Sequence, residues 1–181
     1  MINAIAKAVG DFLKQEGWAD KCLVAERIDD GSGPIIAVRK SARELTPLAL
    51  EGNMAYLRLT GEMEWSGQSQ PLVACSTHGL EVPIRLVVVA FSIPSKFSCA
   101  NIPTVAMDLM IGVVEHIKKQ RAAWSVNQIE IKSMRSNTDP FDVLVAELGD
   151  KAIGPRKDVV FSVDFTLSVY ASAGCLRTLC A

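Results

Sequence analysis

The chain has 181 residues, and its 19 lysines and arginines balance 20 aspartates and glutamates for a formal net charge of −1. General affinity for nucleic acid or an anionic membrane needs a basic surface, so this near-neutral charge argues against both. Hydrophobic residues make up 49% of the sequence, which excludes global disorder. No apolar run approaches the ~20 residues that span a bilayer. We expect no signal peptide, since no basic segment precedes an apolar stretch at the N-terminus.

Helices are predicted where hydrophobic residues recur at three- and four-residue steps. The first covers residues 2–16, and Gly17 follows its last periodic residue as a stop signal. The second covers residues 104–119 and ends in basic residues, which suit the negative end of a helix dipole. A short third helix is predicted to begin at Pro140 and to end at Gly149.

Strands are predicted from the alternation of apolar and polar residues and from one continuous apolar run. Alternation over Met54–Glu64 predicts a strand of an antiparallel sheet with one solvated face. The run Val82–Phe91 predicts a central strand that is covered on both faces. Residues 40–53 are ambiguous, with a short helical turn broken at Pro47 as one interpretation. Residues 22–28 are a short stretch of mixed apolar character, and the other predicted strands are 35–39, Val126–Met134 and, as the clearest and longest, Val159–Tyr170.

The cysteines and histidines predict no metal centre. The five cysteines are odd in number and widely spaced, which favours reduced thiols in a cytosolic compartment. No CxxC pair occurs, and His78 and His116 are the only histidines. The polar segment 65–80 predicts the exposed loop of a long hairpin. Cys75, His78 and Glu81 fall within seven residues there. The alternative to a plain loop is therefore an enzymatic site in which the Cys75 thiol is the nucleophile, the His78 imidazole is the base and the Glu81 carboxylate orients it.

The order of the elements predicts an α+β fold in a single domain over residues 1–181. We expect a mostly antiparallel twisted sheet with two main helices packed on one face, a long hairpin and a long C-terminal strand. An opening amphipathic helix, a charged turn, a strand at Pro34–Val38, a long hairpin, a second helix and a final strand at Val159–Tyr170 resemble the tail-terminator (tail-completion) proteins of long-tailed bacteriophages. The loop 65–80, an insertion at 135–157 and the C-terminal tail 172–181 depart from the family's minimal pattern.

The resemblance implies a non-enzymatic structural protein of the virion tail, made in the host cytoplasm, with no catalytic residue, cofactor or metal. Proteins of that family form rings, typically hexamers, that terminate the tail tube and join it to the head. The implied partners are copies of the same chain, the tail-tube protein and head-completion or neck proteins. No membrane and no specific nucleic acid are implied, although DNA can pass through such a ring.

A ring subunit needs two different edges that close by rotation, and a long strand and a long hairpin are suitable edge-forming parts. We therefore expect strand pairing between neighbouring subunits near Tyr56–Glu64 and Val159–Tyr170. The predicted subunit-interface residues are Tyr56, Arg58, Thr60, Glu62, Asp164, Thr166 and Tyr170.

Two alternatives stay open. One is a small cytosolic enzyme or ligand-binding domain with its site around Cys75 and His78. The other is a different phage connector or baseplate-type component, which the same order of elements fits.

Overall fold

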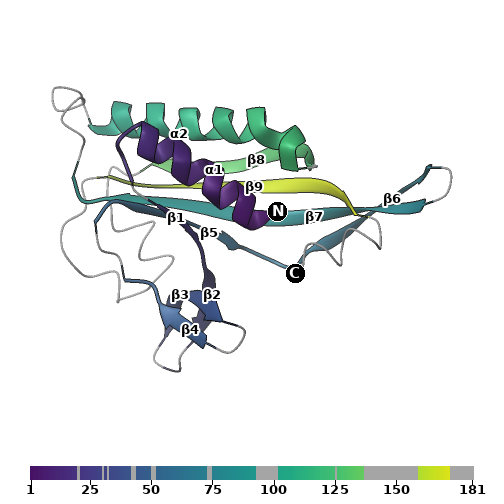
Figure 1. Cartoon of the computed structure of the whole chain (residues 1–181), viewed down its shortest axis with the longest axis horizontal. Helices are drawn as coiled ribbons and strands as arrows, with labels where there is room; N and C mark the ends of the chain where they lie inside the picture. The colour runs from purple at the N-terminus through teal and green to yellow at the C-terminus, as the bar shows by residue number, and fades with distance from the viewer. Residues whose placement is uncertain are drawn as a thin grey trace.

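The computed structural model of the chain describes residues 1–19, 21–29, 31, 33–41, 44–49, 52–72, 75–92, 102–124, 126–136 and 159–171. These residues form a layer of helices on one face of a large, mostly antiparallel sheet, with a smaller sheet beneath the other face (Figure 1). The predicted α+β class is confirmed. The elements are, in chain order, α1 (Ile2–Gln15), β1 (Cys22–Val24), β2 (Glu26–Asp29), β3 (Pro34–Ser41), β4 (Glu44–Pro47), β5 (Met54–Leu59), β6 (Glu64–Leu72), β7 (Cys75–Ala90), α2 (Ile102–Gln120), the 3-10 helix η2 (Arg121–Trp124), β8 (Val126–Ser136) and β9 (Val159–Ala171).

The large sheet is built around the long strand β7. Its strand order is β1-β5-β7-β9-β8, with β1 parallel to β5 and the other neighbours antiparallel. β9 pairs with β7 from His78 opposite Ala171 to Ala90 opposite Val159. The side chains of Leu86–Ala90 are all 0% exposed, so the prediction of a central strand covered on both faces is confirmed.

The main core lies between the sheet and helices α1 and α2. α1 buries Ile5, Val9 and Leu13 at the three- and four-residue spacing that predicted the helix. Phe161 and Phe165 of β9 belong to the same buried cluster. Fully burying a side chain of this kind stabilises a fold by about 1.5–3 kcal/mol, so this layer supplies most of the stability. Both long helices are thus confirmed.

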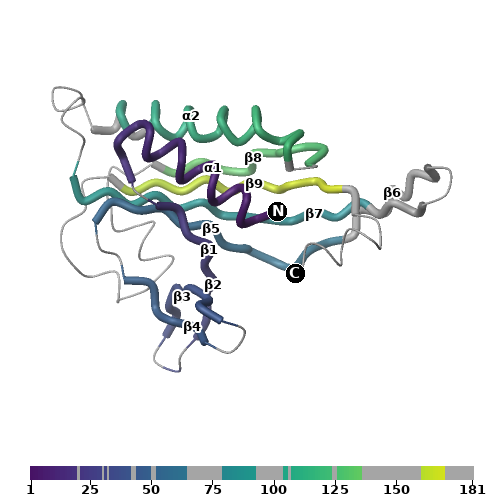
Figure 2. The backbone as a smooth tube through the Cα atoms, in the orientation of Figure 1, coloured from purple at the N-terminus to yellow at the C-terminus, as the bar shows by residue number. Residues whose placement is uncertain are grey.

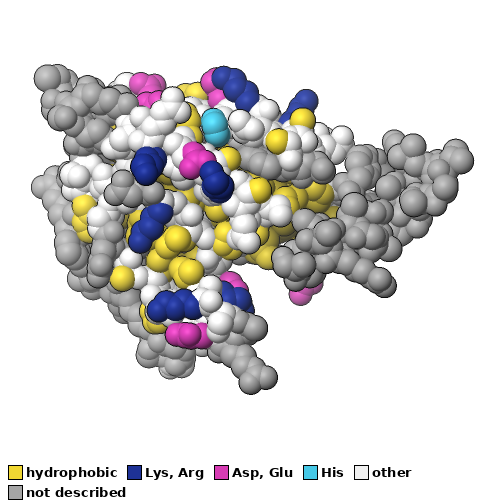
Figure 3. Space-filling model, in the orientation of Figure 1, with side chains coloured by type: hydrophobic (Ala, Val, Ile, Leu, Met, Phe, Trp, Pro, Cys, Tyr) yellow, Lys and Arg dark blue, Asp and Glu magenta, His cyan; other side chains and the backbone are white. Residues whose placement is uncertain are grey.

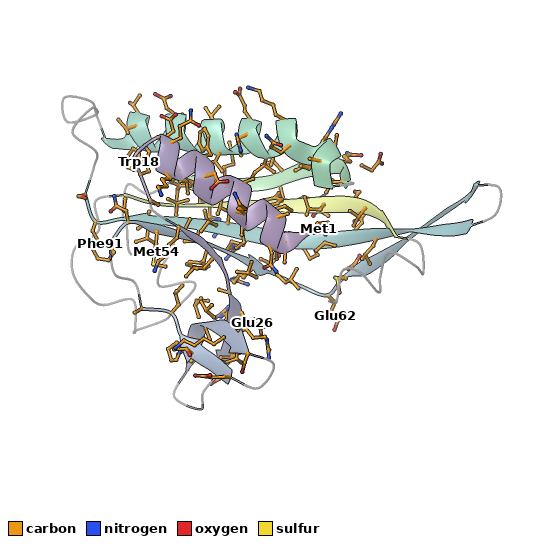
Figure 4. The ribbon with its side chains drawn as sticks, viewed as in Figure 1. Met1, Trp18, Glu26, Met54, Glu62 and Phe91 are labelled. Atoms are coloured by element: carbon orange, nitrogen blue, oxygen red, sulfur yellow. The ribbon has the colours of Figure 1, made fainter. Side chains whose placement is uncertain are left out.

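A second, smaller core lies on the opposite face of the large sheet. There β2, β3 and β4 form an antiparallel sheet, and Ile36 of β3 joins Met54 and Val87 in a buried cluster. Figure 4 shows Met54 and Phe91 on this side of the large sheet. This cover was not predicted, because the ambiguous segment 40–53 contains strand β4 instead of a helical turn.

β5 ends at Leu59 instead of the predicted Glu64. Pro83 of β7 stands beside Thr60 and accepts a hydrogen bond from the Thr60 N–H at 3.1 Å. Proline has no N–H to donate in return, so the ladder loses a bond at this point. The missing donor explains the interruption between β5 and β6.

β6 and the first half of β7 form a two-stranded ribbon that projects from the body of the sheet (Figure 1). Figure 2 shows the rest of β7 running between β5 and β9 in the body of the sheet. The ribbon pairs Glu64 with Glu81 at its base and Leu72 with Cys75 near its tip, and we call it the arm. The prediction of an exposed loop over residues 65–80 is therefore wrong. A polar composition alone does not distinguish an extended ribbon from a loop, so the sequence pattern did not predict these strands.

The remaining predictions divide into two groups. The strands predicted at Val126–Met134 and Val159–Tyr170 are confirmed as β8 and β9. The short helix predicted from Pro140 to Gly149, most of the insertion at 135–157 and the C-terminal tail at 172–181 lie outside the described residues.

Candidate interaction surfaces

The predicted interface residues of the first long strand fall into two environments. Tyr56 and Arg58 are 0% and 6% exposed, so the solvated face predicted for them is wrong, whereas their place at a subunit interface stays a prediction. The smaller sheet covers Tyr56 as part of the second core. Thr60 and Glu62 are exposed in the link after β5, where Glu62 points away from the helices (Figure 4).

The final strand is not an edge of the sheet. β9 pairs with β7 on one side and with β8 on the other, so the prediction that it pairs across a subunit boundary is wrong. Asp164 and Thr166 are half-buried, and the side chain of Tyr170 lies outside the described part of the structure.

Asp164 is held inside the subunit by a network that crosses three strands. Its carboxylate accepts hydrogen bonds from Arg85 Nε at 2.6 Å, from Arg85 Nη2 at 2.9 Å and from Ser133 Oγ at 2.9 Å. Burial opposes ionisation, but these hydrogen bonds and the charges of Arg85 and Arg135 outweigh it and hold the pKa of Asp164 below its usual value. The network ties β7, β9 and β8 together. Arg85 and Ser133 were not predicted, because only the strand register places them opposite Asp164.

The segment considered for an enzymatic site is part of the arm. Cys75 and His78 lie in strand β7, opposite Leu72 and Ala171. Residues three apart in a regular strand are separated by about 10 Å along its axis, a spacing that does not favour contact between a nucleophile and its base. The side chains of Cys75 and His78 are outside the described part of the structure, so this alternative stays a prediction.

A groove of about 400 Å³ lies between α1 and β1 and is lined in part by Lys7, Asp11 and Cys22. Burial raises the pKa of the Cys22 thiol to about 12, so the thiol stays protonated at neutral pH and is a poor nucleophile. Lys7 Nζ is 2.6 Å from Asp11 Oδ2, an exposed pair of a kind common on helix surfaces. None of the lining residues is a histidine that could act as a base. Among the described lining residues, the groove therefore pairs no reactive thiolate with a histidine base.

Exposed large hydrophobic side chains gather at the two margins of the large sheet. Among the described residues, Leu59 (43% exposed) and Met63 (54%) lie at the β5–β6 margin, whereas Met107 (52%), Ile111 (43%) and Met134 (45%) lie on α2 and β8. Figure 3 shows hydrophobic side chains on the surface between the N-terminal end of α1 and the arm. Single exposed hydrophobic residues are ordinary, but groups of them mark interaction surfaces.

The β8 margin is not suited to continuous strand pairing. Bulges interrupt its register between Ile131 and Ser133 and again near its start. Glu130 and Lys132 are exposed on it and form a salt bridge of 2.7 Å. Bulges and charges protect an edge strand from the addition of another strand. Contacts at this margin are therefore expected through side chains.

A scan of protein-family models found no match to this chain, and a search of curated proteins found none. Within the described ranges, no helix is both long and apolar enough to cross a membrane. The same residues contain no group of three or more His, Cys, Asp or Glu side chains placed to hold a metal ion. Function is therefore inferred from the fold and its surfaces.

Proposed function

We propose that this chain is a structural, non-enzymatic subunit that assembles with copies of itself into a ring, and that the ring terminates the tail tube of a phage or phage-like particle and joins it to the head or neck. The observation that carries the proposal is the arm, which extends beyond the body of the sheet (Figure 1). Among the described residues, β6 pairs with β7 alone.

The arm has a physical need for a partner. A two-stranded hairpin on its own is at best marginally stable in water, and an open strand edge is a template for pairing with another chain. A neighbouring subunit that contacts the arm removes both problems, because it covers the ribbon and satisfies its edge. This need supports self-assembly over a role as a freely diffusing monomer.

The assignment to a phage tail rests on the resemblance to tail terminators. The fold contains the elements on which that resemblance is based, namely an opening helix, a long hairpin, a second helix and a long final strand. The resemblance adds the proposed partners, which are the tail-tube protein and head-completion or neck proteins, and the proposed location, which is the virion tail.

The first test of this proposal is electron microscopy of the purified chain alone and mixed with tail tubes assembled from the tube protein encoded in the same genome. We expect ring-shaped particles alone and a ring at the end of the tube in the mixture. Particles of monomer size at high protein concentration would contradict the ring. Binding along the tube wall, or no binding, would contradict the terminator role.

Genomic context separates a terminator from another connector. We expect the coding sequence to lie between those of head-completion proteins on one side and tail-tube or tape-measure proteins on the other. A position among baseplate components would contradict the terminator role while leaving ring assembly intact.

A further inference from the structure

We propose that neighbouring copies of this chain meet head to tail, through two different surfaces on opposite margins of the large sheet. The inference rests on the proposed self-assembly and specifies its contact. The acidic surface lies at the β5–β6 margin, and the basic surface lies along α2 and β8. The acidic surface comprises Leu59, Glu62, Met63 and Glu64, and the basic surface comprises Met107, Ile111, Lys118, Met134 and Arg135.

The helical part of the basic surface is a stripe on the side of α2 away from α1. Met107, Ile111 and Lys118 are spaced by four and seven residues, which places them on one side of the helix. A different side meets α1, since Phe12 stacks on His116 with ring centroids 5.0 Å apart. α1 packs over β1 and β5, whereas α2 packs over β9 and β8. The stripe therefore faces the β8 margin.

The strand part of the basic surface continues this stripe. Met134 stands opposite Val163 of β9, whose side chain belongs to the main core, so Met134 lies on the helix-covered face of the sheet. Its position on the outermost strand of the described sheet leaves 45% of it exposed. Arg135 follows it and is exposed. A hydrophobic strip with basic ends thus borders the edge strand.

The acidic surface lies at the other margin and takes in both faces of the sheet, because Glu62 points away from the helices (Figure 4). Leu59 stands opposite Ile84, a fully buried member of the main core, so it also lies on the helix-covered face. β1 pairs with β5 only as far as Leu57, which leaves the outer side of β5 uncovered by strand at Leu59 among the described residues. Met63 is 54% exposed and lies between two exposed glutamates.

The charges of the two surfaces are complementary. Glu62 and Glu64 supply two negative charges to the acidic surface. Lys118 and Arg135 supply two positive charges to the basic surface, and the exposed Glu115, four residues after Ile111 on α2, reduces its net positive charge to one. Lys132 adds no net charge at the β8 margin, because it forms its salt bridge with Glu130. Complementary charges around a hydrophobic contact steer association and fix its register. This match identifies a second copy of the chain as the occupant of each surface.

The placement of the two surfaces favours a ring over a two-fold dimer. β7 and β9 separate β5 from β8, which puts the margins about 14 Å apart at ~4.8 Å per strand. When subunits join through two unlike surfaces, an open row of subunits has an unused acidic surface at one end and an unused basic surface at the other. Such contacts continue until the rotation between neighbours closes the chain into a ring.

Charge reversal tests the contact at exposed side chains, and because the charge of Arg135 also acts on Asp164, folding is measured alongside assembly. One variant carries Glu62→Lys and Glu64→Lys, the second carries Lys118→Glu and Arg135→Glu, and the third carries all four substitutions. A control with Arg27→Glu and Lys40→Glu makes the same change in net charge as the second variant, at exposed positions of the smaller sheet. Light scattering measures the assembled fraction, and circular dichroism measures folding.

We expect each two-residue variant to lose assembly, with at least a tenfold rise in the concentration needed to assemble. The four-residue variant regains it, as does an equimolar mixture of the first two variants, and the control assembles like the native chain. This contact is overturned if rings persist in both two-residue variants. It is also overturned if the four-residue variant folds and neither it nor the mixture assembles. Both outcomes leave ring assembly by the native chain intact. A native chain that stays monomeric overturns both proposals.

Discussion

The two halves of strand β7 have the same backbone geometry in opposite surroundings. From Ile84 to Ala90 the strand pairs with β5 and β9, and both cores cover it. From Cys75 to Glu81 it pairs with β6 in the arm, where His78–Glu81 also pair with β9 and Leu80 belongs to the main core (Figure 1). Pairing with β6 continues to Cys75, past the last residue of β7 that pairs with β9. The buried half holds the subunit together, and we propose that the arm contacts other chains.

The largest expected effect comes from a cavity in the buried half. Leu86 is 0% exposed in the main core, so Leu86→Ala should lower the free energy of unfolding by about 2–5 kcal/mol. The matched control in the outer half is Glu81→Ala, which removes a half-buried polar side chain and should change stability by about 0.5 kcal/mol or less. Urea denaturation of the two variants measures the contrast. Equal losses in both would contradict the division of β7 into a structural and an available half.

A smaller effect is expected from the polar network beside the buried half. Asp164→Asn weakens the hydrogen bonds from Arg85 and Ser133 and should cost about 1–3 kcal/mol. The exposed pair of Glu130 and Lys132 is the control, and Glu130→Gln should cost at most about 1 kcal/mol.

The same network predicts a pH dependence. Because folding lowers the pKa of Asp164, its stabilisation is present above the ordinary value of 3.8 and is lost as the pH falls through the lower folded value. The difference in unfolding free energy between the native chain and Asp164→Asn should therefore shrink on acidification below pH 3.8. A difference that stays constant down to the acid-unfolding transition would show that the ionised carboxylate is not the stabilising group.

The smallest effect on stability is expected from removing the arm. Replacing residues 66–79 with Asn-Gly joins Trp65 to Leu80, which are already paired, through a two-residue turn. The shortened chain should keep its melting temperature within a few degrees, because the deletion leaves the residues of the main core in place. It should assemble less readily, because the deletion removes the arm but keeps both surfaces of the proposed head-to-tail contact. Thermal melting and light scattering test the two parts separately, and an armless chain that assembles like the native chain would exclude the arm from the subunit contact.

Much of the fold could be predicted because buried hydrophobic residues recur at regular intervals in the sequence. Ile5, Val9 and Leu13 carry the helical period of α1, and the apolar run of β7 marks a strand covered on both faces. The smaller sheet shows no such periodic pattern, because β4 is short and a bulge between Arg39 and Ser41 shifts its pairing with β3. The arm was missed because its sequence is mostly polar and shows no regular alternation of apolar and polar residues.

The surfaces were harder to predict than the fold. Glu62 was expected at a subunit interface, and it lies on the acidic surface, where its role stays a prediction. The exposure of Met107 and Ile111 was not predicted. α2 has hydrophobic residues both on its core-facing side and on its solvent-facing side, and residue type alone does not separate the two. Asp164 was expected to face a partner, but its register with Arg85, 79 residues away in the chain, commits it to the subunit interior. Long-range register is not encoded in any local pattern.

Native mass spectrometry of the intact chain tests the central claim most directly. Self-assembly through the margins of the sheet predicts one dominant species at a fixed multiple of the 19.6 kDa subunit mass, and the same multiple over a range of protein concentrations. A single species at 19.6 kDa over the whole range would contradict the claim.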